Sequence, residues 1–328
     1  MNPKLWLKAL RVIPRISQEE WEKLDLISKL LVSSRAAVVV MTFISAAIAG
    51  LLALRDGQFN LGRWILLAIG LTFAHATNNL LNDLTDYTRG VDKDNYFRTQ
   101  YGPQVLEQGL VTKKTLLNYA ALTGGIALAA GIPLVIFGGM RALLLLIAGI
   151  VFVLFYTWPL KYIGLGELAV IIVWGPLMIG GGYSVITGVW DWNVVIASLP
   201  FALGATTVIF GKHIDKLQED KAKNIHTLPV ILGEKRSRHL AIGMIVLQYL
   251  LVFYLVAIGY FSPVMLAVVL ALYDAIRPVR IYLKPRPTEP PPDLQAGVWP
   301  LWFVAASFVH NRTFGMVFLI AMIVQIFL

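Results

Sequence analysis

The stretch NNLLNDLTDYTRGVD, from Asn78 to Asp92, places carboxylates and carboxamides at the end of an apolar segment of membrane-spanning length. The side chains at offsets 0, 3, 4 and 7 are Asn79, Asn82, Asp83 and Asp86. That spacing puts all four on one face of a helix. Gly90 would let the chain turn and bring Asp92 toward the same face. Because acidic side chains are costly at membrane depth, this cluster predicts a cavity with a function.

A second acidic cluster, KHIDKLQEDK from Lys212 to Lys221, ends another apolar segment. Asp215 and Glu219 are four residues apart and share a helical face, whereas Asp220 lies about 140° from Asp215 on an ideal helix. Either Glu219 is the second acidic ligand, or the helix ends early and Asp220 turns inward. Two carboxylate clusters can hold Mg²⁺, and Mg²⁺ binds phosphate oxygens. The pair therefore predicts Mg²⁺-dependent chemistry on a diphosphate at a membrane surface.

The composition is that of an integral membrane protein. Of 328 residues, 57% are hydrophobic and 14% are charged, against about 25% charged residues in soluble domains. The chain has no Cys, which excludes disulfides, zinc–thiolate sites and thiol nucleophiles. Residues 1–35 carry seven basic residues and no uninterrupted apolar core, so we do not expect a signal peptide.

Nine apolar runs approach the roughly 17 to 25 residues that a membrane-spanning helix needs. They are 36–54, 64–82, 116–137, 142–158, 165–187, 194–211, 239–259, 262–281 and 312–328. A tenth run, 297–309, ends in His-Asn-Arg and is predicted to be an interfacial segment before the last helix. Lipid-exposed open strands would leave backbone groups unsatisfied. We therefore expect an all-α integral membrane protein with nine transmembrane helices around a central cavity open near the cytoplasmic side.

Lys and Arg residues predict the orientation. With the N-terminus inside, 24 of the 28 fall on the cytoplasmic side and three on the outside, and Arg312 lies at the start of the last run. This places the C-terminus outside and both acidic clusters at the cytoplasmic face. We expect a cytoplasmic interfacial segment over 1–35 and a nine-helix domain over 36–328, with polar cytoplasmic loops at 83–115 and 211–238. The basic excess suits an anionic leaflet, so no nucleic-acid partner is expected.

Four stretches carry a resemblance to a known family. They are NDLTDYTRGVD (82–92), GPQVLEQGLVT (102–112), FYTWPLKYIGLGEL (155–168) and HTLPVILG (226–233). Together, over roughly residues 30 to 325, the chain resembles the UbiA-type intramembrane prenyltransferases, most of all the 1,4-dihydroxy-2-naphthoate polyprenyltransferase branch, which makes menaquinone precursors. The resemblance implies nine transmembrane helices and two motifs, N-D-x-x-D-x-x-x-D and D-x-x-x-D, that bind diphosphate through Mg²⁺.

The predicted site combines this resemblance with the clusters. The metal ligands are Asn82, Asp83, Asp86, Asp92, Asp215, Glu219 and Asp220. The catalytic residues are Asp83, Asp86, Asp215, Asp220 and Lys161. The diphosphate-binding residues are Asn79, Arg98, Tyr156, Lys161 and Lys212, and the acceptor-binding residues are His75, His213 and Glu167. Glu167 has a second interpretation, a structural pair with Lys161.

The second cluster departs from the branch pattern. The branch has Asn-Asn-x-Arg-Asp where this chain has Gly-Lys-His-Ile-Asp, from Gly211 to Asp215. Counting back from Thr227 to the usual offset selects Asp220 as the second acid, which gives a D-x4-D spacing from Asp215. The departure is also compatible with a different acceptor.

The implied reaction is the Mg²⁺-dependent transfer of a polyprenyl group from polyprenyl diphosphate to an aromatic acceptor, 1,4-dihydroxy-2-naphthoate. It would take place among lipids in a bacterial or archaeal cell membrane. The other acceptors considered are 4-hydroxybenzoate, homogentisate and a lipid alcohol. A divalent-cation transporter is the alternative from a different class. It is disfavoured because both clusters lie at one face and no acidic residue lies midway along a helix to relay an ion.

Overall fold

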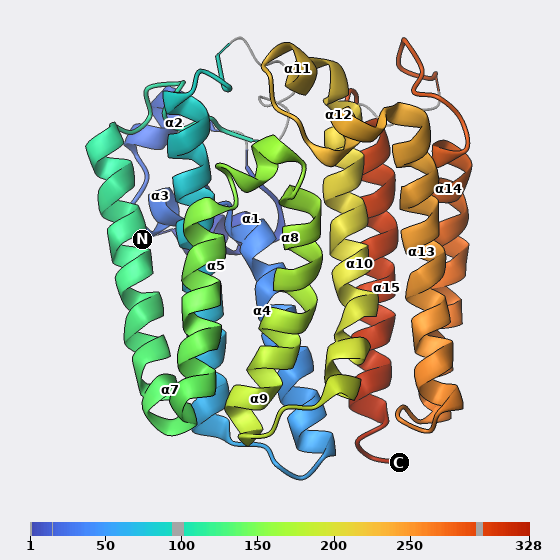
Figure 1. Ribbon diagram of the computed structural model, residues 1–328. Coiled ribbons are helices and arrows are strands. Elements are labelled where there is room, and N and C mark those ends of the chain that lie inside the picture. Colours follow the sequence, from blue (N-terminus) through green and yellow to red (C-terminus); the bar gives the residue numbers. More distant parts are fainter. Residues whose placement is uncertain (1, 15, 94–101, 293–297) are drawn as a thin grey trace. The chain divides into compact units, whose positions relative to one another are not determined.

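The chain was analysed as a computed structural model, which describes residues 2–14, 16–93, 102–292 and 298–328. The described residues form helices and their connections, with no strand among them (Figure 1). They fall into two compact units, Met1–Ala47 with Leu61–Trp158, and Ile48–Asn60 with Pro159–Leu328. Helix α4 (Ala36–Arg55) begins in the first unit and ends in the second.

The first unit contains three short helices before α4 and two long helices after it. The short ones are α1 (Pro3–Arg11), α2 (Gln18–Glu22) and α3 (Leu26–Ser33). The long ones, α5 (Leu61–Thr88) and α7 (Lys113–Phe155), lie side by side (Figure 1). Buried hydroxyls join them, since Thr77 Oγ1 donates to Thr123 Oγ1 at 2.8 Å.

Helix α7 has 43 residues, about 65 Å at 1.5 Å per residue and about twice the thickness of a membrane core. Gly139 interrupts it with a backbone conformation outside the helical region, at φ 61° and ψ −148°. Gly139 adopts this left-handed φ readily because it has no Cβ. The break falls between the predicted runs 116–137 and 142–158.

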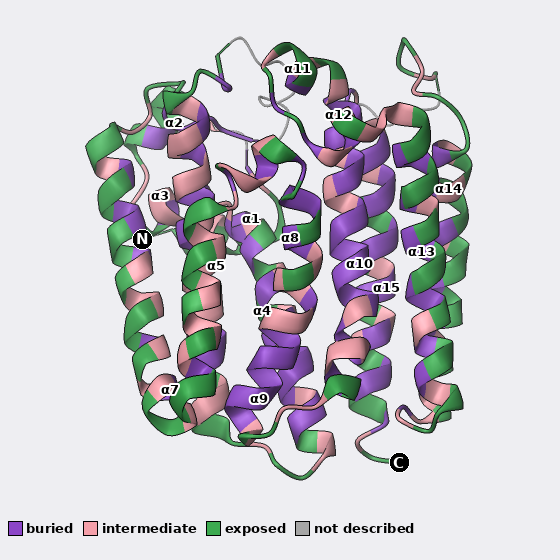
Figure 2. Ribbon diagram, viewed as in Figure 1, coloured by how far each residue is buried: buried purple, intermediate pink, exposed green. Residues whose placement is uncertain are grey.

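The second unit is built around α10 (Trp192–Asp215). The elements before it are η1 (Leu160–Ile163), α8 (Gly166–Ile172), η2 (Val173–Gly180) and α9 (Gly181–Thr187). Those after it are α11 (Leu217–Ala222), α12 (Leu228–Leu232), α13 (Glu234–Ala257), η3 (Pro263–Ala271), α14 (Leu272–Tyr282) and α15 (Trp302–Val324). Helix α10 packs against η2, α13 and α15 and is buried along most of its length (Figure 2).

Small residues allow this close packing. A Cβ added at Gly175 would lie 2.9 Å from Ser198 Oγ, and one at Gly180 would lie 3.1 Å from Val195 Cγ2. A larger residue at either position would force η2 away from α10, which is the usual reason for small residues at helix contacts in membranes.

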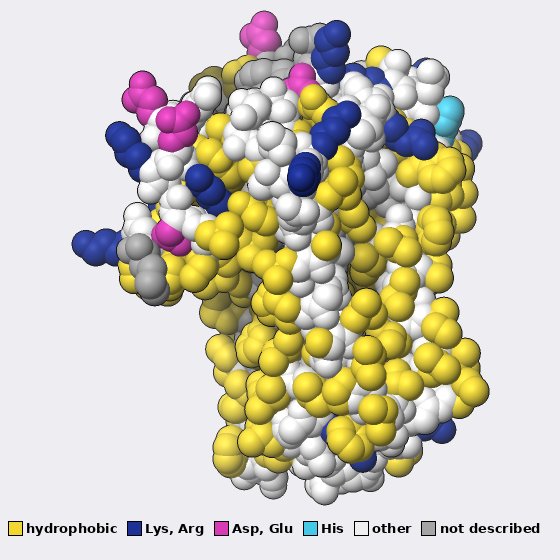
Figure 3. Space-filling model, turned by 90° about the vertical axis from the view of Figure 1, so that its left-hand side faces the viewer, with side chains coloured by type: hydrophobic (Ala, Val, Ile, Leu, Met, Phe, Trp, Pro, Cys, Tyr) yellow, Lys and Arg dark blue, Asp and Glu magenta, His cyan; other side chains and the backbone are white. Residues whose placement is uncertain are grey.

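Seven helices in the described part are long and apolar enough to cross a membrane: α4, α5, α7, the run Gly166–Thr187, α10, α13 and α15. The predicted span 262–281 is not among them, because it divides into η3 and the 11-residue α14. On the face drawn in Figure 3, charged side chains gather toward one end and leave a wide hydrophobic belt. The protein is thus an all-helical integral membrane protein. The count of nine and the central cavity remain predictions.

The prediction of a separate interfacial segment at 297–309 is wrong. Helix α15 runs unbroken from Trp302 to Val324, and the polar sequence from His310 to Arg312 lies inside it. His310 Nε2 is 2.9 Å from Tyr249 Oη, and Thr313 Oγ1 donates to Asp274 Oδ2 at 2.6 Å. Partners on neighbouring helices for His310 Nε2 and for the adjacent Thr313 allow the helix to continue through this sequence.

Candidate active site

The first motif consists of Asn79, Asn82, Asp83, Asp86 and Asp92. Helix α5 extends six residues past the predicted apolar run and carries the first four of them. Asp83 and Asp86 are 3% and 6% exposed, and Asp92 is also buried. Buried carboxylates require compensation by hydrogen bonds, cations or a metal ion.

The turn after α5 is a Schellman motif. Gly90 has φ 69°, its N–H donates to Tyr87 O at 3.1 Å, and Val91 N–H donates to Asp86 O at 2.8 Å. The prediction that the chain turns at Gly90 is confirmed. Val91, the residue after Gly90, is buried, and so is Asp92, which follows it directly.

Arg35 was missed in the sequence. Its guanidinium forms an ion pair with Asp83 in the first motif. Arg35 lies between α3 and α4 with φ 54°, a conformation uncommon for residues other than glycine. The two residues are 48 positions apart, and no spacing rule connects them. The positive φ could not be read from the sequence.

The two asparagines of the motif hold α5 in place within its unit. Asn79 Nδ2 donates to Ser34 O at 2.8 Å, and Asn82 Nδ2 donates to Thr157 Oγ1 at 2.9 Å. The bond made by Nδ2 orients each carboxamide. The Oδ1 atom, which a metal ion would bind, takes no part in that bond.

The other predicted residues of this unit are His75, Tyr156 and Arg98. His75, one turn before Asn79 on α5, has its Nδ1 2.6 Å from Thr42 Oγ1 and is half-buried. Tyr156 is the half-buried C-cap of α7. Arg98 lies outside the described residues.

The second motif consists of Asp215, Lys216, Glu219 and Asp220. Helix α10 ends at Asp215, and a new helix, α11, starts at Leu217. Of the two alternatives, this is the one in which the helix ends early and Asp220 turns inward. Asp220 is 2% exposed, whereas Glu219 is half-buried. Lys216 Nζ lies 3.0 Å from Asp220 Oδ1.

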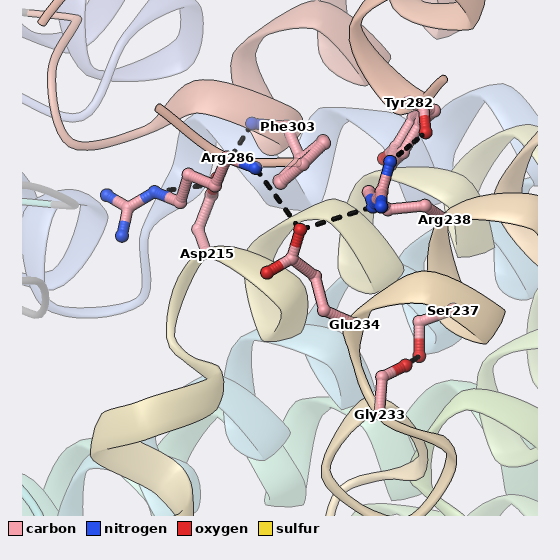
Figure 4. Close-up of polar contacts among 8 residues, drawn as sticks. All are labelled: Asp215, Gly233, Glu234, Ser237, Arg238, Tyr282, Arg286 and Phe303. Carbon is pink, nitrogen blue, oxygen red and sulfur yellow. Dashed lines mark hydrogen bonds and ion pairs between the residues drawn. The ribbon is translucent and has the colours of Figure 1, made fainter. Parts of the chain in front are cut away.

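The carboxylate of Asp215 caps the N-terminus of α15. Its Oδ1 accepts from Phe303 N–H and its Oδ2 from Val304 N–H, each at 3.0 Å. Arg286 Nε lies 3.7 Å from Oδ1 (Figure 4). The N–H groups of Phe303 and Val304 are two of the four that the start of a helix leaves without intrahelical partners. Gly211 permits the approach, because a Cβ there would lie 2.8 Å from Val304 N.

Figure 4 shows further hydrogen bonds and ion pairs close to Asp215. Glu234 Oε1 accepts from Arg286 N–H at 3.1 Å and pairs with Arg238 Nε at 3.2 Å. Arg238 Nη1 in turn donates to Tyr282 O at 2.9 Å. Asp215 therefore belongs to a structural network that joins α10, α13, α14 and α15.

The predicted acceptor residues His213 and Glu167 contact each other. His213 Nδ1 lies 2.6 Å from Glu167 Oε1, and Glu167 Oε2 accepts from Leu228 N–H at 3.3 Å. Both side chains are buried. Glu167 thus pairs with His213, and its predicted pairing with Lys161 remains a prediction. Lys161 is buried on η1, with its Nζ 5.6 Å from the Tyr162 ring centroid, and Lys212 is half-buried on α10.

The first motif has the donor set that Mg²⁺ prefers. It offers three buried carboxylates and two carboxamides, all hard oxygen ligands. In the described ranges, no three His, Asp or Glu side chains are already gathered as a metal cluster. A metal ion with several water or phosphate ligands needs only one or two carboxylates from the protein, so the first motif fits Mg²⁺.

Several curated proteins are similar to this chain in sequence. UbiA prenyltransferase domain-containing protein 1 homolog of Drosophila melanogaster is 26% identical over 228 residues, 67% of this chain and 61% of that protein. The protein of related name from Gallus gallus is 26% identical over 195 residues, 56% of this chain and 55% of that protein. The matches thus span less than two thirds of these animal relatives. A 1,4-dihydroxy-2-naphthoate octaprenyltransferase of Bacillus subtilis is 22% identical over 254 residues, 76% of this chain and 81% of that protein.

Solved structures share the fold. A UbiA homolog from Aeropyrum pernix K1 aligns with a TM-score of 0.62 and 20% identity over 87% of this chain and 98% of that one. A UbiA homolog from Archaeoglobus fulgidus, bound to GPP and Mg²⁺, aligns with a TM-score of 0.58 and 17% identity over 88% of this chain and 99% of that one. The sequence model of the UbiA prenyltransferase family matches residues 43–293. The chain therefore belongs to the UbiA prenyltransferase family.

Proposed function

We propose that this enzyme transfers a polyprenyl group from polyprenyl diphosphate to the aromatic acceptor 1,4-dihydroxy-2-naphthoate, with Mg²⁺ as cofactor. The observation that carries the proposal is the pair of buried carboxylates, Asp83 and Asp86, at the end of a membrane-length helix in a chain of this family. Ionisable groups at membrane depth are expensive and usually functional. The Archaeoglobus fulgidus homolog bound to GPP and Mg²⁺ supports the substrate class.

Asp83, Asp86 and Asp92 would hold Mg²⁺ together with Asn82. When bound, Mg²⁺ neutralises charge that develops on the departing diphosphate. Arg98, Lys161 and Lys212 are proposed to bind diphosphate oxygens, with Asn79 and Tyr156. Arg35 keeps Asp83 oriented and partly neutralised before substrate binds.

The predicted second-motif ligands fit a metal ion less well. Asp215 already accepts two backbone N–H groups, Asp220 pairs with Lys216, and Glu219 is only half-buried. Their role as metal ligands remains a prediction. Of the three, Asp220 fits best, because its buried Oδ2 accepts no hydrogen bond from any described residue.

In the proposed reaction the bond between the allylic carbon and the diphosphate oxygen breaks, and the diphosphate leaves with the electron pair. An aromatic carbon of the acceptor supplies the pair for the new carbon–carbon bond and then loses its proton. His75, His213 and Glu167 are proposed to bind the acceptor. The bond between Glu167 and His213 fixes the orientation of the imidazole ring.

The choice of acceptor rests on the four sequence stretches of that branch and on the similarity to the Bacillus subtilis octaprenyltransferase. A lipid alcohol is the second candidate, because the second motif departs from the branch pattern at Gly211 to Asp215. The proposed topology has the N-terminus in the cytoplasm and the C-terminus outside. A bacterial or archaeal membrane was predicted, and the relatives come from animals as well as from bacteria.

The test is a transfer assay with purified full-length chain in nanodiscs and radiolabelled geranyl diphosphate. The acceptors are 1,4-dihydroxy-2-naphthoate, 4-hydroxybenzoate, homogentisate and a glycerol-based lipid alcohol, each with Mg²⁺ and with EDTA. We expect prenylated naphthoate only with Mg²⁺. Preferred labelling of another acceptor would reassign the substrate. No transfer to any acceptor, with divalent-ion flux in liposomes, would favour the transporter.

A further inference from the structure

The two motifs end in the same backbone turn. After Asp220, Asn224 N–H donates to Lys221 O at 3.2 Å and Ile225 N–H donates to Asp220 O at 2.8 Å. Asn224 has φ 54° and occupies the place that Gly90 has in the first motif. The turn after Asp86 makes the same two bonds. Asp220 is therefore the structural counterpart of Asp86.

This register shows what the second motif lacks. Counting back from Asp220 as from Asp86 places Lys216 at the position of Asn82 and Leu217 at the position of Asp83. The second motif thus has one carboxylate in this register where the first has two. Asp215 does not replace the missing one, because its two oxygens bind the N–H groups of Phe303 and Val304.

Lys216 occupies a position suited to anion binding. It is 7% exposed and sits at the junction of α10 and α11, four residues before Asp220. Its ammonium group has three N–H donors, and the bond to Asp220 Oδ1 at 3.0 Å uses one. In the first motif Asp83 is also paired with a cation, Arg35, but Asp86 adds a second carboxylate there, whereas Asp220 has no second carboxylate in its register.

The net charges of the two segments differ in sign. Residues 79–92 hold three Asp and one Arg, a net charge of −2. Residues 212–223 hold four Lys against two Asp and one Glu, a net charge of +1. A negative segment attracts a divalent cation, whereas a positive one attracts phosphate.

We propose that the second motif is a direct phosphate site rather than a metal site. Lys216 Nζ donates to a phosphate oxygen of the bound anion, and Asp220 positions that ammonium group. The identity of the anion as a diphosphate rests on the proposed function.

The first test measures binding of radiolabelled inorganic pyrophosphate to the full-length chain in nanodiscs, in EDTA. We expect measurable binding by the wild type, and Lys216→Ala should weaken it about tenfold or more. Lys216→Arg should retain most of it. The matched control is Lys221→Ala, an exposed lysine of the same helix, which should change affinity less than about twofold. No metal-free binding by the wild type, or equal effects of the two alanine variants, would overturn the proposal.

The second test counts bound Mn²⁺ by electron paramagnetic resonance, as a substitute for Mg²⁺. Asp83→Asn should lose Mn²⁺ binding, whereas Asp220→Asn should keep it and bind pyrophosphate more weakly per folded molecule. A merely structural salt bridge would instead lower the melting temperature at unchanged pyrophosphate affinity. Loss of Mn²⁺ from Asp220→Asn would make Asp220 a metal ligand and contradict the proposal.

These outcomes separate the inference from the proposed function. Prenyl transfer by a chain that binds pyrophosphate independently of Lys216 overturns the inference alone. Pyrophosphate binding through Lys216 without any prenyl transfer overturns the proposed function alone.

Discussion

At the scale of single residues, we expect the carboxylates of the first motif to decide activity. Asp86→Asn should lower the turnover number about 100-fold or more, which corresponds to about 2.7 kcal/mol of transition-state stabilisation. The reason is that an amide cannot supply the negative charge that Mg²⁺ requires. The measurement is prenyl transfer under saturating substrate. Asp191→Asn is the control, because Asp191 caps α10 and Asn caps a helix as well as Asp does. Equal turnover in both variants would contradict the assigned role.

In the second motif, Asp220→Asn should lose about tenfold more activity than Glu219→Gln. Asp220 is buried and paired with Lys216, whereas Glu219 is half-buried on α11. Both variants replace one carboxylate by its amide and so remove the same charge. If Glu219→Gln is the more damaging change, Glu219 is the residue that faces the substrate.

The acidic residues of both motifs could be found in the sequence because their spacing follows the helix period. The cationic partner of Asp83 could not. Arg35 reaches Asp83 across 48 residues from a left-handed backbone position. Asp215 was predicted as a ligand, but its partners are backbone N–H groups of α15, 88 and 89 residues away. No local pattern encodes such long-range contacts.

At the scale of elements, the approach of α10 to the start of α15 depends on Gly211. Its Cβ would lie 2.8 Å from the carbonyl carbon of Phe303 and from Val304 N, and these backbone atoms cannot rotate away. Gly211→Ala should destabilise the protein by about 1–3 kcal/mol, measured as a lower melting temperature in nanodiscs. Gly243→Ala on α13 is the matched control, because its Cβ would meet nothing within 4 Å. There the substitution should be neutral or stabilising by up to about 1 kcal/mol.

The carboxylate of Asp215 caps the start of α15, and removing one of its oxygens tests this role. Asp215 uses both carboxylate oxygens as acceptors, whereas an amide has only one acceptor oxygen. Asp215→Asn should therefore leave one N–H group at the start of α15 without its acceptor and lower stability by about 1 kcal/mol. Hydrogen exchange at Phe303 and Val304 should rise, whereas exchange at Val91, in the turn of the first motif, should not. Unchanged exchange at Phe303 and Val304 would mean that the carboxylate does not hold this helix end.

Apolar length predicted most helices, and it failed where polar residues lie inside a helix. His310, Asn311 and Arg312 suggested a boundary, yet α15 passes through them. Tyr249 on another helix supplies a partner to His310, and Asp274 supplies one to the adjacent Thr313. The short 3₁₀ and α segments from Pro263 to Tyr282 also departed from the predicted single span. Hydropathy measures only the tendency to leave water and does not report on side-chain partners.

At the scale of the whole molecule, the uneven distribution of Lys and Arg predicts the orientation in the membrane. Because the chain has no Cys, one introduced Cys gives a unique label. Gln58, between α4 and α5, and Gln218, on α11, are both exposed. In sealed right-side-out vesicles, Gln58→Cys should react with a membrane-impermeant maleimide, and Gln218→Cys should react only after permeabilisation. Both variants must first show wild-type prenyl transfer, so that labelling reports on the native fold. The reverse pattern would place the second motif outside, where a diphosphate made in the cytoplasm could not reach it, and the positive-inside assignment would have to be abandoned.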